Sequence, residues 1–154
     1  MVYAVIRVRG TVNIKPDIKK TMQLLKLNQI NHCVLLEENV VIKGMLQMVK
    51  DYTTWGEINK ETLIKLISIR GKLMGDKPVT AEYLKTATQY HNIENLSEAI
   101  LENKMRYKEI PDVKPFFRLN PPKKGYRTVK RSFVNKGSLG YRKNEINQLI
   151  ERML

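Results

Sequence analysis

The sequence has 154 residues with 28 Lys or Arg against 15 Asp or Glu, and its formal net charge is +13. This length suits one domain, or one domain with an appendage, and the charge points to nucleic acid or an anionic membrane surface as partner. The single cysteine excludes an internal disulfide framework. No apolar run approaches the roughly 20 residues that span a bilayer, and no secretory signal is recognisable. We therefore expect a cytosolic protein.

The first 58 residues alternate between strand-like and helix-like patterns. Residues 2–9 have the period of two that is typical of a strand. Pro16 suits the first turn of a helix, and Asn39 is a suitable N-cap for a second helix. The expected order is a strand at 2–9, a helix from Pro16, a short strand at 33–36, a helix at 40–50 and a strand at 52–57.

This β-α-β-α-β order predicts an α+β core. The economical packing is one three-stranded sheet with both helices on a single face. The other face would then stay open and present Arg7 and Arg9. In the second helix, we expect an apolar stripe of Val41, Met45, Met48 and Val49.

Residues 60–112 read as a helical segment in three pieces that packs on the core. Thr80 is expected to cap the second piece. Asn95 and Glu98 have the spacing of a capping box, which places the start of the third piece there. The segment is amphipathic and its charges are nearly balanced, which favours packing over catalysis.

Residues 113–144 hold ten Lys or Arg and no Asp or Glu. Because such a run cannot neutralise itself, we expect polyphosphate as its partner, with each Lys or Arg that meets a phosphate releasing a counterion. Aromatic residues between the charges add surfaces on which bases stack. The alternative is a solvated, disordered charged tail, although such tails are usually poor in aromatic residues.

The prolines of this basic arm prevent a long helix, and PFFRL and RSFV are expected as short strands around the Pro-Pro-Lys-Lys-Gly turn. A closing helix near 144–153 carries an apolar stripe of Ile146, Leu149, Ile150 and Met153. This stripe needs a partner, so we expect the helix to dock on the body. Residues 113–143 would bury too little apolar area to offset backbone ordering, which predicts an arm that is mobile until RNA binds.

The residues that enzymes need are sparse. The chain has two histidines, His32 and His91, and Cys33 would point to the opposite face of a strand from its neighbour His32. The glycines of RGKLMGDK lack the spacing of a P-loop, and the carboxylates are scattered. We therefore expect no catalytic residues, no metal site and no enzymatic activity.

Each aromatic residue could serve either in packing or in contact with RNA. Trp55 suits core packing better than stacking on a nucleotide. Phe116 and Phe117 are expected to anchor the arm to the body, whereas Tyr126 and Tyr141, beside Lys and Arg, are candidates for contacts with bases or ribose. For Arg7 and Arg9 the alternative to RNA binding is a role in surface solubility.

Several motifs in this order resemble the family of universal large-subunit ribosomal protein thirty, called protein seven in eukaryotes. The resemblance covers essentially all 154 residues. The longer, archaeal and eukaryotic form is indicated by the Pro115-Phe116 pair, the Pro-Lys-Gly turn and the closing Asn-Gln-Leu-Ile helix; the missing basic N-terminal extension looks archaeal. The signature positions are the AVIRVRG opening, Met22, Leu25, Leu27, Gln29, His32, Val34, Ile42-Lys43-Gly44-Met45, Leu46, Val49 and Tyr52.

The resemblance implies a three-stranded antiparallel sheet with two helices, no catalytic activity and no cofactor. It also implies a ribosome-bound structural protein of the large subunit that binds large-subunit rRNA close to the 5S RNA region, next to other large-subunit proteins. A small-molecule substrate and a membrane are not expected.

The leading hypothesis is thus a structural rRNA-binding protein whose units are a core at 1–59, a helical extension at 60–112 and a basic arm with a docked helix at 113–154. Alternatives are a free-standing RNA chaperone or regulator, a small RNA-processing enzyme and, last, a membrane-surface protein. The candidate RNA-binding residues are Arg7, Arg9, Lys15, Lys19 and Lys20 in the core, and Arg118, Lys123, Lys124, Tyr126, Arg127, Lys130, Arg131, Lys136, Tyr141, Arg142 and Lys143 in the arm.

Overall fold

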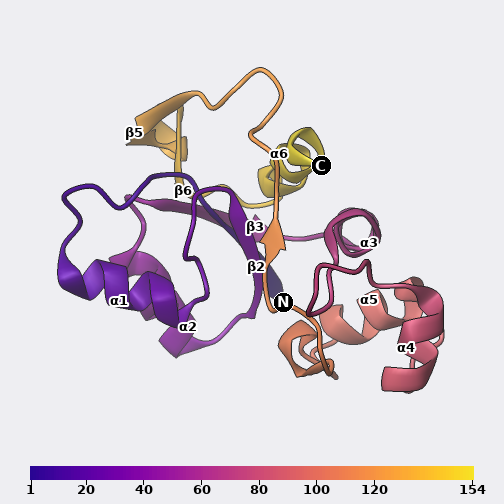
Figure 1. The fold of residues 1–154 in the computed structure, drawn as a ribbon. Coiled ribbons are helices and arrows are strands. Elements are labelled where there is room, and N and C mark those ends of the chain that lie inside the picture. Colours follow the sequence, from indigo (N-terminus) through magenta and orange to yellow (C-terminus); the bar gives the residue numbers. More distant parts are fainter.

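A computed structural model describes all residues from 1 to 154 and shows an α+β fold built on one six-stranded sheet (Figure 1). The strand order is β4-β2-β1-β3-β6-β5. The strands are β1 Val2–Arg7, β2 His32–Glu37, β3 Thr53–Glu57, β4 Phe117–Arg118, β5 Thr128–Ser132 and β6 Gly137–Tyr141. The helices are α1 Pro16–Leu24, α2 Val40–Met48, α3 Lys60–Arg70, α4 Ala81–Ala87, α5 Ile93–Leu101 and α6 Glu145–Met153, with short 3-10 turns at Tyr107–Glu109 and Phe133–Asn135.

The three central strands confirm the predicted β-α-β-α-β core. β1 pairs antiparallel with β2 on one side and with β3 on the other. Three further strands, all from the basic arm, extend this sheet: β4 pairs with β2, and β6 with β3. The sheet is therefore twice as wide as the sequence predicted, because the arm contributes to both of its edges.

The prediction of an open sheet face is wrong, because helices cover both faces (Figure 1). α1 and α2 pack over the face that carries Tyr3, Val5 and Val34. The opposite face, with Ala4 and Ile6, is covered by α3, α5 and α6. Every residue of β1 is buried, as expected for a strand with apolar side chains on both faces.

The first two helices begin where the sequence predicted. Pro16 opens α1, and the Asn39 side chain accepts a hydrogen bond from the amide of Val41 at the start of α2, 3.3 Å away. The apolar stripe of α2 is wrong in part. Val49 is buried and Met45 packs against the core as predicted, but Val41 and Met48 are 66% and 51% exposed, and Leu46 is buried in their place.

The helical segment follows the predicted order, with one boundary wrong. Thr80 caps α4 by accepting a hydrogen bond from the Tyr83 amide. The capping box at Asn95 does not form, because α5 already begins at Ile93 after Asn92, which places Asn95 inside the helix. α3 and α5 contact each other and supply Leu63, Leu66 and Leu96 to the larger core.

The arm is attached to the body at three places. Phe117 in β4 is fully buried and stacks on Tyr107 with ring centroids 4.7 Å apart, and β6 lies beside β3. α6 docks as predicted, burying Ile146 and Ile150. Residues 113–119 and 137–142 are therefore part of the fold, and for them the expectation that the arm buries too little apolar area is wrong. The exposed section of the arm is residues 120–136, with Pro122 buried within it.

The two predicted arm strands form only in part and do not lie around one turn: PFFRL contributes Phe117–Arg118, and RSFV contributes only the last two residues of β5 before the 3-10 turn at Phe133–Asn135. β4 occupies the edge beside β2, and β5 occupies the opposite edge of the sheet beside β6. The chain from Leu119 to Arg127 crosses one end of the sheet to connect them (Figure 1). This crossing places the Pro-Pro-Lys-Lys-Gly turn next to α6.

Candidate RNA interface

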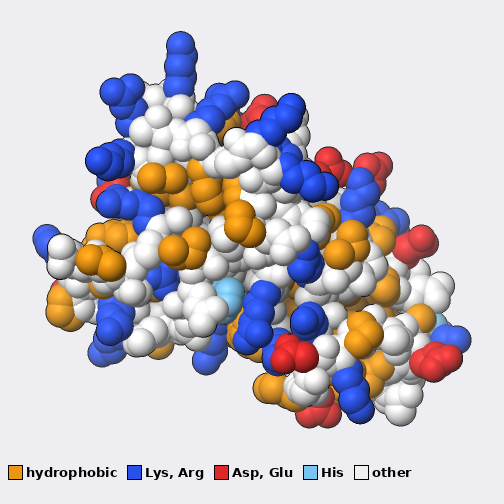
Figure 2. Space-filling view, turned by 45° about the horizontal axis from the view of Figure 1, so that its top comes forward, with side chains coloured by type: hydrophobic (Ala, Val, Ile, Leu, Met, Phe, Trp, Pro, Cys, Tyr) orange, Lys and Arg blue, Asp and Glu red, His pale blue; other side chains and the backbone are white.

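Most of the predicted cations lie on the surface. Lys15, Lys19 and Lys20 are exposed at the start of α1. In the arm, eight candidate side chains are exposed, namely Arg118, Lys123, Lys124, Arg127, Lys130, Arg131, Lys136 and Lys143. Blue Lys and Arg side chains project from the upper left of Figure 2, in the region of β5, whereas red Asp and Glu side chains gather mainly at the right.

None of these exposed cations has an acidic partner within the protein. The ion pairs of the structure all involve other basic residues, for example Lys43 with Glu38, Lys65 with Glu151 and Lys114 with Asp76. β5 is exposed along its whole length and forms a sheet edge. The arm thus presents uncompensated positive charge on a strand held by the sheet.

Arg7 is not a surface residue, contrary to the prediction. Its side chain is 2% exposed, and its guanidinium donates to the carbonyl oxygens of Leu27, Asn28 and Arg9 at 2.8 to 2.9 Å. Burial lowers the pKa of Arg7. Arg7 therefore ties β1 to the chain segment after α1, and phosphate cannot reach it.

Arg142 is likewise buried, with 7% of its surface exposed. Its guanidinium donates to Thr54 Oγ1 at 2.7 Å and to the Ser138 carbonyl oxygen at 2.8 Å, and it lies over the Phe133 ring. Burial lowers the pKa of Arg142 to about 10. This arginine joins β6 to β3 from inside.

Arg9 is half-buried and lies at the end of the sheet where β6 begins. Its guanidinium donates to the Asp51 carbonyl oxygen at 3.2 Å and lies 5.2 Å from the centroid of the Tyr52 ring. Both contacts leave part of the Arg9 guanidinium facing solvent, so Arg9 stays a candidate for a phosphate contact.

The two candidate tyrosines already have partners in the protein. Tyr126 is half-buried, and its hydroxyl donates to Asn31 Oδ1 at 2.8 Å; burial is the main reason that its pKa rises to about 12. Tyr141 is 39% exposed, and its hydroxyl donates to Glu57, which raises the pKa of Tyr141 to about 12. Tyr126 thus anchors the arm, and Tyr141 is the more exposed of the two tyrosines.

Phe116 and Phe117 anchor the arm, as predicted. Phe116 stacks on His32 with ring centroids 4.6 Å apart and an interplanar angle of 15°, and the Arg118 guanidinium lies 5.8 Å from the Phe116 centroid. Trp55 is half-buried beside Tyr141 and packs against the core under α2, which agrees with its core reading.

One functional residue of the arm was missed by sequence reasoning. Arg152 in the last turn of α6 donates to the carbonyl oxygens of Lys123 and Gly125 at 2.6 to 3.0 Å. These bonds hold the turn that displays Lys123 and Lys124. The signal that would have identified it is a basic residue at the C-terminal end of a helix, although nothing local indicates which carbonyls it meets.

Three further features of the structure bear on other kinds of site. The structure holds no group of three or more His, Cys, Asp or Glu placed to bind a metal ion. Cys33 is fully buried, and burial raises the pKa of its thiol to about 12. No helix has the length and apolar character to cross a membrane.

Comparison with known proteins gives a consistent picture. Residues 3–53 match the family model described as ribosomal protein L30p/L7e. The chain is 49% identical to the large ribosomal subunit protein uL30 of Methanosphaera stadtmanae, over 99% of both chains. It is 51% identical to that of Thermoplasma volcanium, over 98% of this chain and 92% of the relative, and 44% identical to that of Methanocorpusculum labreanum, over 98% and 99%.

These relatives come from archaea and match nearly end to end, which confirms the resemblance and its archaeal type. The chain belongs to the uL30 family of large ribosomal subunit proteins, a structural and non-enzymatic family.

Proposed function

We propose that this chain binds and stabilises folded large-subunit rRNA through the exposed cations of its arm. The observation that carries the proposal is the eight exposed Lys and Arg side chains of residues 118–143, none of which has an acidic partner. Phosphate is the ligand that such a surface attracts, and each contact releases a condensed counterion.

The folded part of the chain acts as the mount for this surface. β4, β6 and α6 fix both ends of the exposed section, and Arg152 fixes its turn. Phosphate contacts position a protein without reading sequence, and A-form RNA is recognised mainly by its shape and 2′-hydroxyls. Specificity then comes from the fold of the rRNA, into which a prearranged set of cations fits.

The RNA site comprises the eight exposed arm cations together with Arg9, Lys15, Lys19, Lys20 and Tyr141. Following the family resemblance, we place the binding region close to the 5S RNA, with neighbouring large-subunit proteins around it. Ordering of the arm by RNA stays a prediction, which we restrict to residues 120–136 because nearly all side chains there are exposed.

Cosedimentation tests this function against a free-standing RNA chaperone or regulator. We expect the protein to remain with purified large subunits through a moderate salt wash, because many phosphate contacts must break together. A free-standing chaperone would be shed in the same wash. Loss of the protein from subunits that keep their other proteins would therefore refute the structural role.

A further inference from the structure

On its outer edge, β2 is paired along only two of its six residues. β4 pairs with β2 at His32 and Cys33 alone, and the rest of β2, through Glu37, has no strand beside it on that side. Pairing stops at the position where Pro115 would face Leu35. Proline has no N–H to donate to the ladder, and the chain leaves the sheet there, with the Lys114 amide bonding the Lys72 carbonyl oxygen instead.

The alternation of an antiparallel ladder identifies the free backbone groups. The Glu38 amide donates to Met1 in the direction of β1, whereas the Asn31 carbonyl accepts from Leu119 in the direction of β4. Even-numbered residues of β2 therefore bond β1, and odd-numbered residues face outward. Leu35 and Glu37 thus direct their N–H and C=O groups to the open edge, and neither has a backbone partner beyond the strands.

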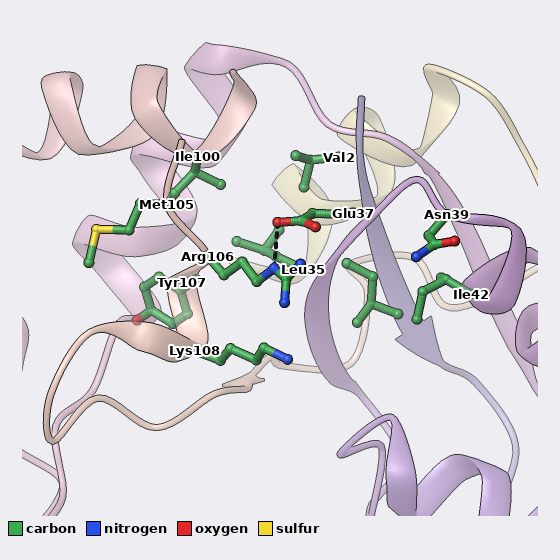
Figure 3. A pocket seen from close by; sticks show the side chains of 11 residues that line it. Val2, Leu35, Glu37, Asn39, Ile42, Ile100, Met105, Arg106, Tyr107 and Lys108 are labelled. Carbon is green, nitrogen blue, oxygen red and sulfur yellow. Dashed lines mark hydrogen bonds and ion pairs between the residues drawn. The ribbon is translucent and has the colours of Figure 1, made fainter. Parts of the chain in front are cut away.

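A groove of about 160 Å³ lies along this open edge (Figure 3). It is lined by Leu35 and also by Leu36, whose side chains point to opposite faces of the sheet, so the groove follows the edge itself. On one face it is bounded by Ile100 and Met105, and on the other by Ile42. This is the space that the side chains of one more strand would occupy.

The Arg106 side chain crosses the groove in Figure 3 and pairs with Glu37 at 2.7 Å. The arginine side chain is 50% exposed, and such ion pairs contribute little to stability. Arg106 can therefore move aside at a small cost in free energy. Its displacement makes the backbone of Leu35 and Glu37 accessible from solvent.

The chemistry of this edge differs from that of β5, the other edge of the sheet. β5 is fully exposed and carries Lys130 and Arg131, which suits RNA. The β2 edge is lined mainly by apolar side chains, and of its three charged residues Glu37 is paired with Arg106, which leaves Lys108 as the one unpaired cation. Unpaired N–H and C=O groups beside apolar pockets are the features that bind an extended peptide by strand addition.

We propose that an extended segment of a neighbouring protein adds to the sheet beside Leu35–Glu37 and places an apolar side chain against Ile100 and Met105. Its backbone continues the ladder that β4 leaves at Pro115. The inference rests on assembly of this chain into the large subunit, but it uses none of the residues proposed to bind RNA. The two proposals can therefore fail separately.

Photocrosslinking in assembled subunits tests the groove. A benzoylphenylalanine at Lys108, an exposed position on the groove wall, should crosslink to one polypeptide segment in purified large subunits. The same probe at Glu82, exposed on α4, serves as the control and should not capture that segment. Capture of rRNA at position 108, or of nothing in subunits that contain the protein, would overturn the proposal.

A substitution in the groove makes the test specific. M105E places a charge among the apolar side chains and should lower the crosslink from position 108 about tenfold, as expected for losing one buried apolar contact. M74E makes the same change at a methionine that is 62% exposed elsewhere and should leave the yield unchanged. Both variants should bind naked rRNA as the wild type does; equal crosslinking by M105E and M74E would refute the strand-addition site.

Hydrogen exchange supplies a readout that does not depend on the probe. In the free protein, the amides of Leu35 and Glu37 should exchange faster than those of Val34 and Leu36, which face β1. In the assembled subunit the amides of Leu35 and Glu37 should become protected. If they stay fast there, no strand has been added and the proposal is wrong.

Discussion

His32 shows how the arm and the core depend on each other at the scale of one residue. The side chain is 4% exposed, and neither ring nitrogen has a hydrogen-bond partner. Phe116 of the arm covers it by stacking. Burial lowers the pKa of His32, and the positive charges of Arg118 and Arg7 lower it further. The imidazole is therefore kept neutral in the folded protein.

This burial predicts a pH dependence of stability. In the unfolded chain the imidazole takes up a proton once the pH falls below about 6.5, whereas the folded protein keeps it neutral down to a lower pKa. Between the lowered pKa and about 6.5 the unfolded state binds more protons than the folded state, so the free energy of unfolding falls as the pH drops through this range. The stabilisation that depends on neutral His32 is fully present above about pH 6.5. H32F should lose less stability between pH 7 and pH 5 than the wild type, as measured by denaturant unfolding.

The matched control for this prediction is H91F, which removes the other imidazole from an exposed position. It should keep the decline that the wild type shows. If H32F and H91F lose the same stability as the wild type over this range, His32 is not the group responsible.

Arginine is also where sequence reasoning was least able to assign a role. Arg7 and Arg118 have the same chemistry, yet Arg7 is enclosed by the carbonyls of Leu27 and Asn28, whereas Arg118 is exposed. Two of the three acceptors of Arg7, the carbonyl oxygens of Leu27 and Asn28, are 20 and 21 residues away in sequence, so no local pattern reveals them. Composition correctly predicted a basic surface, but not which cations are used inside the fold.

At the scale of elements, the junction of β3 and α6 is packed as closely as backbone atoms allow. A Cβ added at Gly56 would lie 2.0 Å from the Lys143 carbonyl oxygen and 3.0 Å from Ile146 Cβ. This contact lets the arm return to the body directly over β3. By contrast, a Cβ added at Gly44 in α2 would meet no atom within 4 Å.

The two glycines therefore predict opposite effects of the same substitution. G56A should destabilise the protein by about 1–3 kcal/mol, because the junction between β3 and α6 must shift. G44A should stabilise it by about 0.5–1 kcal/mol, because alanine is the better helix former at an exposed position. Thermal or denaturant unfolding of both variants measures this difference, and a similar loss in both would contradict the close packing described for Gly56.

Element order was largely predictable, whereas the partners of elements were not. Period-two and helical patterns correctly gave the three central strands and the docking of α6, because these patterns are local. The separation of β4 from β5 depends on contacts between residues more than 80 positions apart, such as Thr54 with Gly140, and the coverage of both sheet faces also depends on pairings that no local pattern specifies. A short, charged strand such as β5 has no apolar alternation from which its edge position could be inferred.

At the scale of the whole molecule, charge and folding are divided between two parts of the same sheet. The central strands and their helices supply both hydrophobic cores, and the section from Asn120 to Lys136 supplies exposed cations at one edge. This section contributes +6 of the net charge of +13, displayed on a folded scaffold, and the open edge of β2 gives that scaffold a second, less basic surface for protein.

The central claim, that the arm cations hold rRNA by phosphate contacts, is tested most directly by the salt dependence of binding. Two variants each replace four exposed lysines by glutamine and so change the net charge equally. The arm variant changes Lys123, Lys124, Lys130 and Lys136, and the body variant changes Lys50, Lys77, Lys85 and Lys104.

Titration of large-subunit rRNA at several salt concentrations gives the slope of log affinity against log salt for each protein. In the arm variant the magnitude of this slope should decrease by about 0.7–0.9 for each phosphate contact removed, or about 3 for all four lysines. The body variant should keep the wild-type slope. Equal slopes in the two variants, or an affinity of the wild type that does not change with salt, would contradict the claim.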